Sequence, residues 1–275
     1  MTRTLCILAA LTACTSTSSD PLLPGEQLAN LPLLQTDDYP CGADSDTDGD
    51  GTADVRWEYF LDERGRDFHD VGHLLAGGPD MTMDSTYDHI GHLTLFVEHD
   101  APDATFTYEA LYDTLGNNVE VTYTDVYGSE PAYVDRTVYS NFDDLGQPAE
   151  SLETSPDPAP VHTAYSYDVM GRLVEMNLDT GNDGSVETVT TVVYDDSART
   201  VTVTSTSTSG AHSTRKKTYD DLGYVITDHT DRFAADGTHT TRDYIIERDG
   251  ARLIRDRFLD SGMLLFASTY LYDCR

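Results

Sequence analysis

The residues best suited to chemistry form an acidic segment at residues 44–54, DSDTDGDGTAD. Alternate carboxylates around a glycine are the oxygen ligands that Ca²⁺ prefers, and their spacing follows positions 1, 3, 5, 7 and 9 of an EF-hand loop. The segment therefore predicts a calcium site. Its candidate ligands are the side chains of Asp46, Asp48, Asp50 and Asp54 and the backbone carbonyl of Thr52.

Position 12 of this loop is Trp57, so the bidentate Glu of a complete EF-hand is missing. We therefore expect weak affinity, of about 10⁻⁴ to 10⁻³ M, as in extracellular calcium modules. The alternative is a solvated acidic cap in which the Asp-Gly pairs only make turns.

A second, weaker candidate loop lies at residues 179–187, DTGNDGSVE. It keeps the acidic residues of positions 1, 5 and 9, which are Asp179, Asp183 and Glu187, but it has no acid at position 3. An Asp-Gly hairpin turn explains the same residues without a metal, and we favour that interpretation here.

Histidines and catalytic motifs give weaker evidence for a functional site than the acidic loops do. His69, His73, His89, His92 and His99 cluster early in the chain, and pairs three or four residues apart can chelate a transition metal, with Asp70 assisting. There is no HExxH motif, and two of these histidines fall in a predicted turn, so we favour surface histidines. No signature of nucleophilic catalysis or of phosphate or dinucleotide binding is present, and we predict no catalytic residue.

A turn that recurs along the chain predicts the strands that must position these residues. The turn has an aromatic or apolar residue, then an acidic residue, and in most copies Gly three residues after the acid, with successive acids 25 to 30 residues apart. The acidic residues are Asp62, Asp88, Asp113, Asp143, Asp168, Asp195, Asp220, Glu247 and Asp273.

Each such turn has a clear physical basis. Asp accepts hydrogen bonds from the amides that follow it, and Gly takes the positive φ of a type I turn with a bulge. A second turn precedes several anchors by about 11 residues, at Asp50-Gly51, Asp183-Gly184 and Asp236-Gly237, where Asp-Gly predicts two-residue hairpins. Together with period-two alternation, this predicts an all-β fold of 17 or 18 strands: tandem β-hairpin repeats in a large, twisted, curling antiparallel sheet, either an open spiral or a closed barrel.

Segments such as Tyr165-Ser-Tyr167-Asp168-Val-Met-Gly171 and Thr218-Tyr219-Asp220-Asp-Leu-Gly223 resemble the tyrosine-aspartate (YD) repeat family, also called the Rhs repeat. The resemblance covers about residues 55–275 and implies a long β-sheet that spirals. In large toxins of this family the sheet encloses a cargo domain. This chain is too short for that and has no Asp-Pro-x-Gly cleavage motif, so the resemblance is carried over for the repeat architecture alone.

The first residues indicate export. Arg3, an apolar stretch from Leu5 to Leu11 and the sequence Leu11-Thr12-Ala13-Cys14 predict a lipoprotein signal peptide at residues 1–13, with Cys14 as the lipidated residue. Residues 14–40 are then a lipidated cysteine with a flexible tether, 41–54 the Asp-rich cap and 55–275 the repeat domain. We expect a bacterial cell-envelope protein anchored by lipid at the outer membrane. A formal net charge of −32 argues against nucleic acid as a partner.

Two cysteines remain after Cys6 is removed with the signal and Cys14 is acylated. In an oxidising compartment Cys41 and Cys274 predict one intrachain disulfide, the alternative being free or intermolecular thiols. A flat sheet of some 17 strands would span roughly 80 Å, whereas a disulfide needs Cα atoms within about 7 Å. The bridge therefore requires a sheet that curls until its ends meet.

The function that these features favour is non-catalytic: an envelope or cell-surface lipoprotein whose β-repeat body serves structure, adhesion or ligand contact, with carbohydrate or envelope proteins as partners and calcium as the candidate cofactor. Two alternatives stay open. One is a surface hydrolase that acts on polysaccharide through acidic residues, and the other is an accessory or immunity protein of a toxin system.

Overall fold

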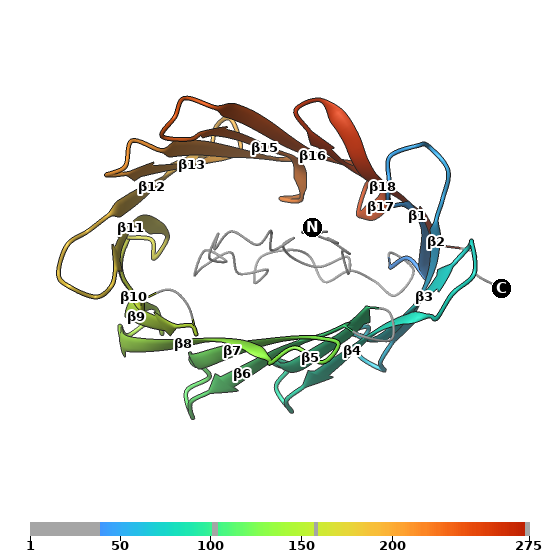
Figure 1. The fold of residues 1–275 in the computed structure, drawn as a ribbon, viewed down its shortest axis with the longest axis horizontal. Helices are drawn as coiled ribbons and strands as arrows, with labels where there is room; N and C mark the ends of the chain where they lie inside the picture. Colours follow the sequence, from blue (N-terminus) through green and yellow to red (C-terminus); the bar gives the residue numbers. More distant parts are fainter. Residues whose placement is uncertain (1–38, 101–103, 157–158, 273–275) are drawn as a thin grey trace.

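The chain forms one closed antiparallel barrel (Figure 1). A computed structural model describes residues 39–100, 104–156 and 159–272, and their 18 strands confirm the all-β prediction. No helix among these residues is long and apolar enough to cross a membrane. The strands are β1 (Gly42–Asp46), β2 (Val55–Leu61), β3 (Asp67–Leu74), β4 (Met81–Tyr87), β5 (Leu93–Asp100), β6 (Ala104–Tyr112), β7 (Asn118–Tyr127), β8 (Tyr133–Phe142), β9 (Pro148–Thr154), β10 (Val161–Tyr167), β11 (Leu173–Thr180), β12 (Thr188–Asp195), β13 (Thr200–Ser207), β14 (His212–Tyr219), β15 (Val225–Phe233), β16 (His239–Asp249), β17 (Arg252–Asp260) and β18 (Met263–Leu271).

The barrel closes through its shortest strand. Each strand from β2 to β18 pairs with its neighbours in sequence, and β1 lies between β2 and β18. Ala43 of β1 is opposite both Trp57 and Tyr270, and a buried contact of 2.8 Å joins the Ser45 and Ser268 hydroxyls across the seam. Of the two expected arrangements, the sheet therefore takes the closed one. The strands around β1 are called the seam side below.

Alternation along the strands separates an inner from an outer face. On β2, Val55 and Trp57 are buried while Arg56 and Glu58 are exposed. A side chain on the outside of a single-layer barrel has nothing above it, so the buried set points inward. The outer face carries ion pairs between neighbouring strands, such as Arg56 with Asp44 and Arg136 with Glu120.

Two apolar cores line the inner face on opposite sides of the ring. The larger one, the seam core, is built from Ala43, Val55, Trp57, Met81, Met83, Leu253 and Tyr270. The indole of Trp57 lies over Gly72, where a Cβ would come within 2.7 Å of the ring, so Gly72 is needed for close packing. The smaller one, the far core, consists of Leu173, Met176 and Val192 with partly buried tyrosines and valines around it.

The up-and-down order puts two kinds of connection on opposite rims. One rim holds the turns β2–β3, β4–β5 and so on to β16–β17, which contain the repeated acidic turns, and is called the YD rim. The other holds the hairpins β1–β2, β3–β4 and so on to β17–β18, and is called the acid-loop rim because both candidate calcium loops lie there. Figure 1 shows β1–β2 and β11–β12 on opposite sides of the ring.

Two turn predictions need correction, and one repeat departs from the common turn. Strand β16 continues through Glu247 to Asp249, so that chain reversal occurs at Gly250-Ala251 instead of at Glu247. Ala198 does not take the positive φ that Gly takes in the other repeats, and Arg199 adopts it instead, with φ 52°. The Asp-Gly pairs do not form two-residue hairpins: their loops span residues 47–54, 181–187 and 234–238. In the first two of these loops, buried aspartates draw the backbone into longer loops by accepting amide hydrogen bonds.

Candidate cation loops and the YD rim

The seam loop, residues 46–54 between β1 and β2, gathers three of the predicted ligands. One carboxylate oxygen from each of Asp46, Asp48 and Asp50 lies within 4.8 Å of the others. Asp46 is buried, whereas the other two side chains are exposed to solvent. Asp54 does not belong to this group of carboxylates. The cluster therefore contains positions 1, 3 and 5 of the predicted loop.

Backbone amides hold the seam loop in shape. The Asp46 carboxylate accepts hydrogen bonds from the N–H groups of Gly49 at 2.6 Å and Gly51 at 2.8 Å. Asp54 turns back toward the start of the loop, where its Oδ2 accepts from the backbone N–H of Thr47 at 2.8 Å and from its hydroxyl at 2.9 Å. Asp54 thus closes the loop by hydrogen bonding and is not gathered with the other carboxylates.

The far loop, residues 179–187 between β11 and β12, has the same construction. Oxygens of Asp179, Asp183 and Glu187 lie within 4.8 Å of one another. Asp179 is buried and accepts from the N–H groups of Asp183 at 3.0 Å and Gly184 at 2.7 Å. Glu187 accepts from the backbone N–H of Thr180 at 2.6 Å, as Asp54 does from Thr47.

The equivalence extends to the strands that carry the loops. The N–H of Asp54 donates to Ser45, and that of Glu187 donates to Leu178. The carbonyls of Asp54 and Glu187 each accept from the following hairpin, from Leu75 at 2.7 Å and Thr208 at 2.8 Å respectively. Two segments 133 residues apart therefore fold into the same loop on the same rim.

Both loops present the donor set of a hard divalent cation. Each contributes three carboxylates, and Ca²⁺ takes six to eight oxygens, often completed by water. Because two of the carboxylates in the seam group are exposed, such an ion would have access to solvent. The chemistry of the carboxylates fits Ca²⁺ in both loops, whereas the sequence favoured calcium for the seam loop alone; calcium binding stays a prediction.

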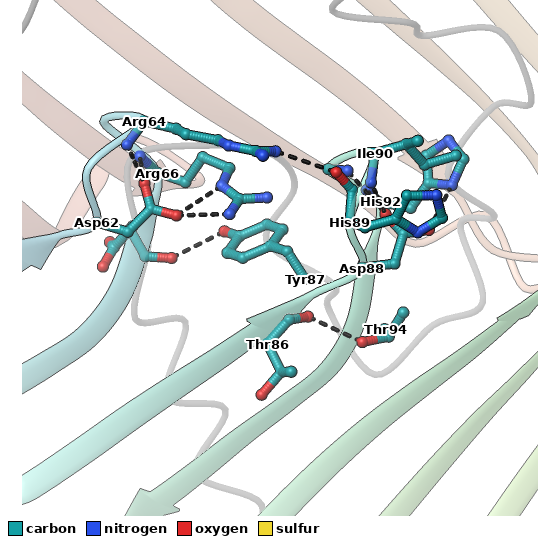
Figure 2. A network of polar contacts seen from close by, with 12 residues as sticks. Asp62, Arg64, Arg66, Thr86, Tyr87, Asp88, His89, Ile90, His92 and Thr94 are labelled. Atoms are coloured by element: carbon teal, nitrogen blue, oxygen red, sulfur yellow. Dashed lines mark hydrogen bonds and ion pairs between the residues drawn. The ribbon is translucent and has the colours of Figure 1, made fainter.

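The YD rim shows why Tyr and Asp recur together (Figure 2). Asp88 accepts from the backbone N–H groups of Ile90, Gly91 and His92, and so shapes its own turn. Tyr87 reaches back to the previous repeat, where its hydroxyl donates to the Asp67 carbonyl at 2.8 Å. The hydroxyls of Tyr112, Tyr167 and Tyr272 donate in the same way to Leu93, Pro148 and Leu253. The pair thus joins one turn to the next.

A third residue completes this link. The residue four after the turn Asp lies against the tyrosine of the next repeat: the Arg66 guanidinium is 4.4 Å from the Tyr87 ring centre, and the His92 and Tyr112 ring centres are 4.4 Å apart. We did not predict this position from the sequence. Its signal is the recurrence of planar polar residues there, namely Arg66, His92, Asn117, Gln147 and Arg172.

Hydrogen bonds within the turn lower the pKa of several turn carboxylates, among them Asp113 and Asp168. The backbone and side-chain N–H groups of Asn117 lower the pKa of Asp113 and outweigh the effect of desolvation. At Asp168 the backbone N–H and guanidinium of Arg172 lower the pKa in the same way. An open depression on the YD rim is lined by Asp62, Glu63, Arg64, Arg66, Tyr87, Asp88 and His89. Its polar groups mostly bond to each other, so they hold the turns in place.

The early histidines belong to such local contacts. His69 bonds to Asp84, His73 to Asp80, His92 to Asp88 and His99 to Thr105. Among the described residues, the groups of three or more His, Cys, Asp or Glu that could hold a metal are the two acidic loops, and neither includes histidine.

Buried carboxyl groups on the seam side were not predicted as a group. Asp70 is 2% exposed and Asp256 is fully buried. Burial, together with the neighbouring Asp67 carboxyl, raises the pKa of Asp70 to about 9. Burial also raises the pKa of Asp256, although Tyr244, Tyr270 and the Ser268 amide donate hydrogen bonds to it. No sequence signal separates these two from the other acidic residues.

Of the two cysteines of the predicted disulfide, Cys41 lies among the described residues. Cys41 is disulfide-bonded, and its backbone N–H donates to the Leu271 carbonyl at 2.8 Å. Its predicted partner Cys274 lies outside the described residues, as do the signal peptide, Cys14, Asp273 and most of the tether.

No family model and no curated protein matches the chain. Among solved structures, it is similar to a porin-like protein from Bacteroides uniformis, with 13% identity over 84% of this chain and 95% of that one and a TM-score of 0.45. It is also similar to the Photorhabdus luminescens Tc holotoxin pore, with 13% identity over 77% of this chain and 14% of that one and a TM-score of 0.37. Similarity at this level does not extend to function.

Proposed function

We propose that this protein is a non-catalytic, lipid-anchored protein of the bacterial cell envelope, placed at the outer membrane through acylated Cys14. Its closed barrel is a rigid scaffold that presents the calcium-binding seam loop and the similarly folded far loop for contact with envelope carbohydrate or protein. The observation that carries this proposal is the shared hydrogen-bond pattern of the two acidic loops on one rim.

The outer face of the barrel supports placing the body outside the bilayer. A strand surface in contact with lipid needs an outward apolar band. Here the outward side chains include the pairs Arg56–Asp44, Arg136–Glu120 and Arg257–Glu247. Attachment through lipid at Cys14 suits such a surface, because two or more acyl chains are enough for stable anchoring.

The buried carboxyl groups do not favour a hydrolase. A polysaccharide-acting enzyme needs a general acid with a raised pKa that touches the sugar. Asp70 and Asp256 have raised pKa values, but their side chains are enclosed by the seam core and have essentially no exposed surface. Their role is therefore structural in this proposal.

Calcium binding is tested by isothermal titration of the metal-free mature protein with CaCl₂. We expect one site with Kd of about 10⁻⁴ to 10⁻³ M, lost in Asp46→Asn and retained in Asp179→Asn. No heat in the wild type, or identical heat in both variants, would contradict the calcium part of the proposal.

Anchoring is tested separately by mass spectrometry of the protein purified from membranes. We expect an N-terminal peptide that starts at Cys14 and carries acyl chains, and we expect Cys14→Ser to move largely to the soluble fraction. Membrane association that survives Cys14→Ser in full, with no acyl mass on the peptide, would contradict the lipid anchor.

A further inference from the structure

Five turns of the YD rim place an exposed apolar side chain at the same position, two residues after the turn Asp. These side chains, the apolar row, are between 48% and 85% exposed. They are Ile90, Leu115, Leu145, Met170 and Leu222.

The geometry of the turn gives the row a common direction. In each turn the backbone N–H of the apolar residue donates to the turn Asp, at 2.8 to 3.0 Å. The turn itself does not require an apolar residue there, because Arg64 and Ser197 occupy the equivalent position in other repeats. The apolar side chains therefore add nothing to the turn and are free to serve a contact.

Four members lie in successive turns, from β4–β5 to β10–β11. Strands spaced about 4.8 Å apart put every second connection about 10 Å from the next, so the row extends for roughly 30 Å along the rim. Neighbouring turns also touch: a Cβ at Gly171 would lie 3.2 Å from the Leu145 side chain. Val169, beside Met170, adds a fully exposed side chain to the same end of the row.

The start of β1 lies on this rim as well. Gly42, the first residue of β1, pairs with Leu271 at the YD-rim end of β18 and with Glu58 in the middle of β2. Cys14 precedes the first described residue, Tyr39, by 25 residues, and a chain of that length can span at most roughly 80 to 90 Å. A bilayer that holds the acyl chains of Cys14 would therefore stay within reach of the YD rim.

We propose that the YD rim is a membrane-contacting edge, in which the apolar row enters the headgroup and upper acyl region of the bilayer that holds the lipid anchor. This inference rests on the lipid anchoring proposed above. The preferred surface is zwitterionic, because acidic side chains beside the row, such as Glu63, Asp144 and Asp221, would be repelled by anionic headgroups. With this rim on the membrane, the acid-loop rim and both candidate calcium loops face away from it.

The contact is tested first without the anchor, so that its failure is distinct from failure of lipidation. The full mature chain carrying Cys14→Ser is floated with phosphatidylcholine–phosphatidylethanolamine vesicles. Combining Leu115→Ser, Leu145→Ser and Met170→Ser should lower the vesicle-bound fraction at least about fivefold. The matched control, Leu75→Ser with Met263→Ser, removes two exposed apolar side chains from the opposite rim and should leave binding unchanged.

A second measurement uses the acylated protein with its disulfide intact. An environment-sensitive dye on Leu115→Cys should shift to shorter wavelength on vesicles and be shielded from an aqueous quencher, whereas the same dye on Met263→Cys should not. Equal spectra and quenching at the two positions, or flotation that does not depend on the row, would overturn the proposal. A row variant that changes only the molar mass in solution would assign the row to self-association instead.

Discussion

The seam loop and the far loop have the same internal hydrogen bonds but different surroundings. A Cβ on Gly49 of the seam loop would lie 2.0 Å from the Leu264 carbonyl oxygen of β18, so this loop is packed against the closing strand. At Gly181 and Gly184 of the far loop, a Cβ would meet nothing within 4 Å. One loop is thus part of the barrel closure, and the other projects from a wall that is already complete.

The same contrast holds beneath the loops. The seam core includes Trp57 and Tyr270 and adjoins the buried carboxyl groups of Asp70 and Asp256. The far core is smaller, and the buried carboxyl group on its described strands β11 and β12 is that of the loop residue Asp179. A repeated motif therefore gains a structural role where the ends of the sheet meet, and its cation should affect stability more on that side.

The largest expected effect comes from adding a side chain at Gly49, where a Cβ has no room. Gly49→Ala adds a methyl group against the Leu264 carbonyl and also strains a backbone with φ 79°. We expect a loss of more than about 3 kcal/mol in the free energy of unfolding, measured by urea denaturation.

Gly51→Ala is the control for this substitution. Gly51 has a similar positive φ, 91°, but open space around its Cβ position, so that only backbone strain of about 1 to 2 kcal/mol should appear. Equal losses for the two variants would mean that packing on β18 does not distinguish the seam loop.

The next effect concerns the buried aspartates. Asp46→Asn removes a charged acceptor of two short amide hydrogen bonds, and we expect a loss of about 2 kcal/mol with the calcium response abolished. Trp57, the single tryptophan, lies in the seam core and reports on this side. In Asp179→Asn, calcium should still change the Trp57 emission as in wild type, since the far loop has no contact with that core.

The third effect is the pH dependence that Asp70 adds on the seam side. Asp70 has a folded pKa of about 9 against an ordinary value of 3.8, so the folded state holds the proton more tightly. Its contribution to stability is complete below about pH 4 and is lost as the pH rises through 9. Between pH 5 and 9, wild type should therefore lose more stability than Asp70→Asn, which cannot ionise.

Chemical denaturation at several pH values measures this slope. Glu109→Gln, which changes an exposed residue on the outer face of β6, is the control and should follow wild type. A slope that is the same in Asp70→Asn and wild type would show that Asp70 does not carry the dependence.

The seam and far sides also differ in how much could be predicted from the sequence. The repeat spacing predicted the strands, and the acidic residues predicted where the two loops lie, because turns depend on residues close together in sequence such as Asp168 and Gly171. The sequence did not decide whether the sheet closes, because the pairing of β1 with β18 joins segments more than 220 residues apart. The packing of Gly49 on Leu264 and the burial of Asp70 depend on that closure, and no local pattern contains them.

The smallest effect tests a ligand position at which the two loops differ. Asp48 occupies the third loop position of the seam loop, where the far loop has Gly181. Because Asp48 is exposed, Asp48→Gly should change stability by no more than about 1 kcal/mol, while calcium affinity falls roughly tenfold. The reverse change should not restore a site, because Gly181 has φ 99°, a conformation that a side chain at this position disfavours. Calorimetry of Asp48→Gly and Gly181→Asp therefore tests whether the loops differ in calcium binding because of the carboxylate at this position or because of their backbone conformation. A strong new site in Gly181→Asp would favour the simpler, one-carboxylate difference.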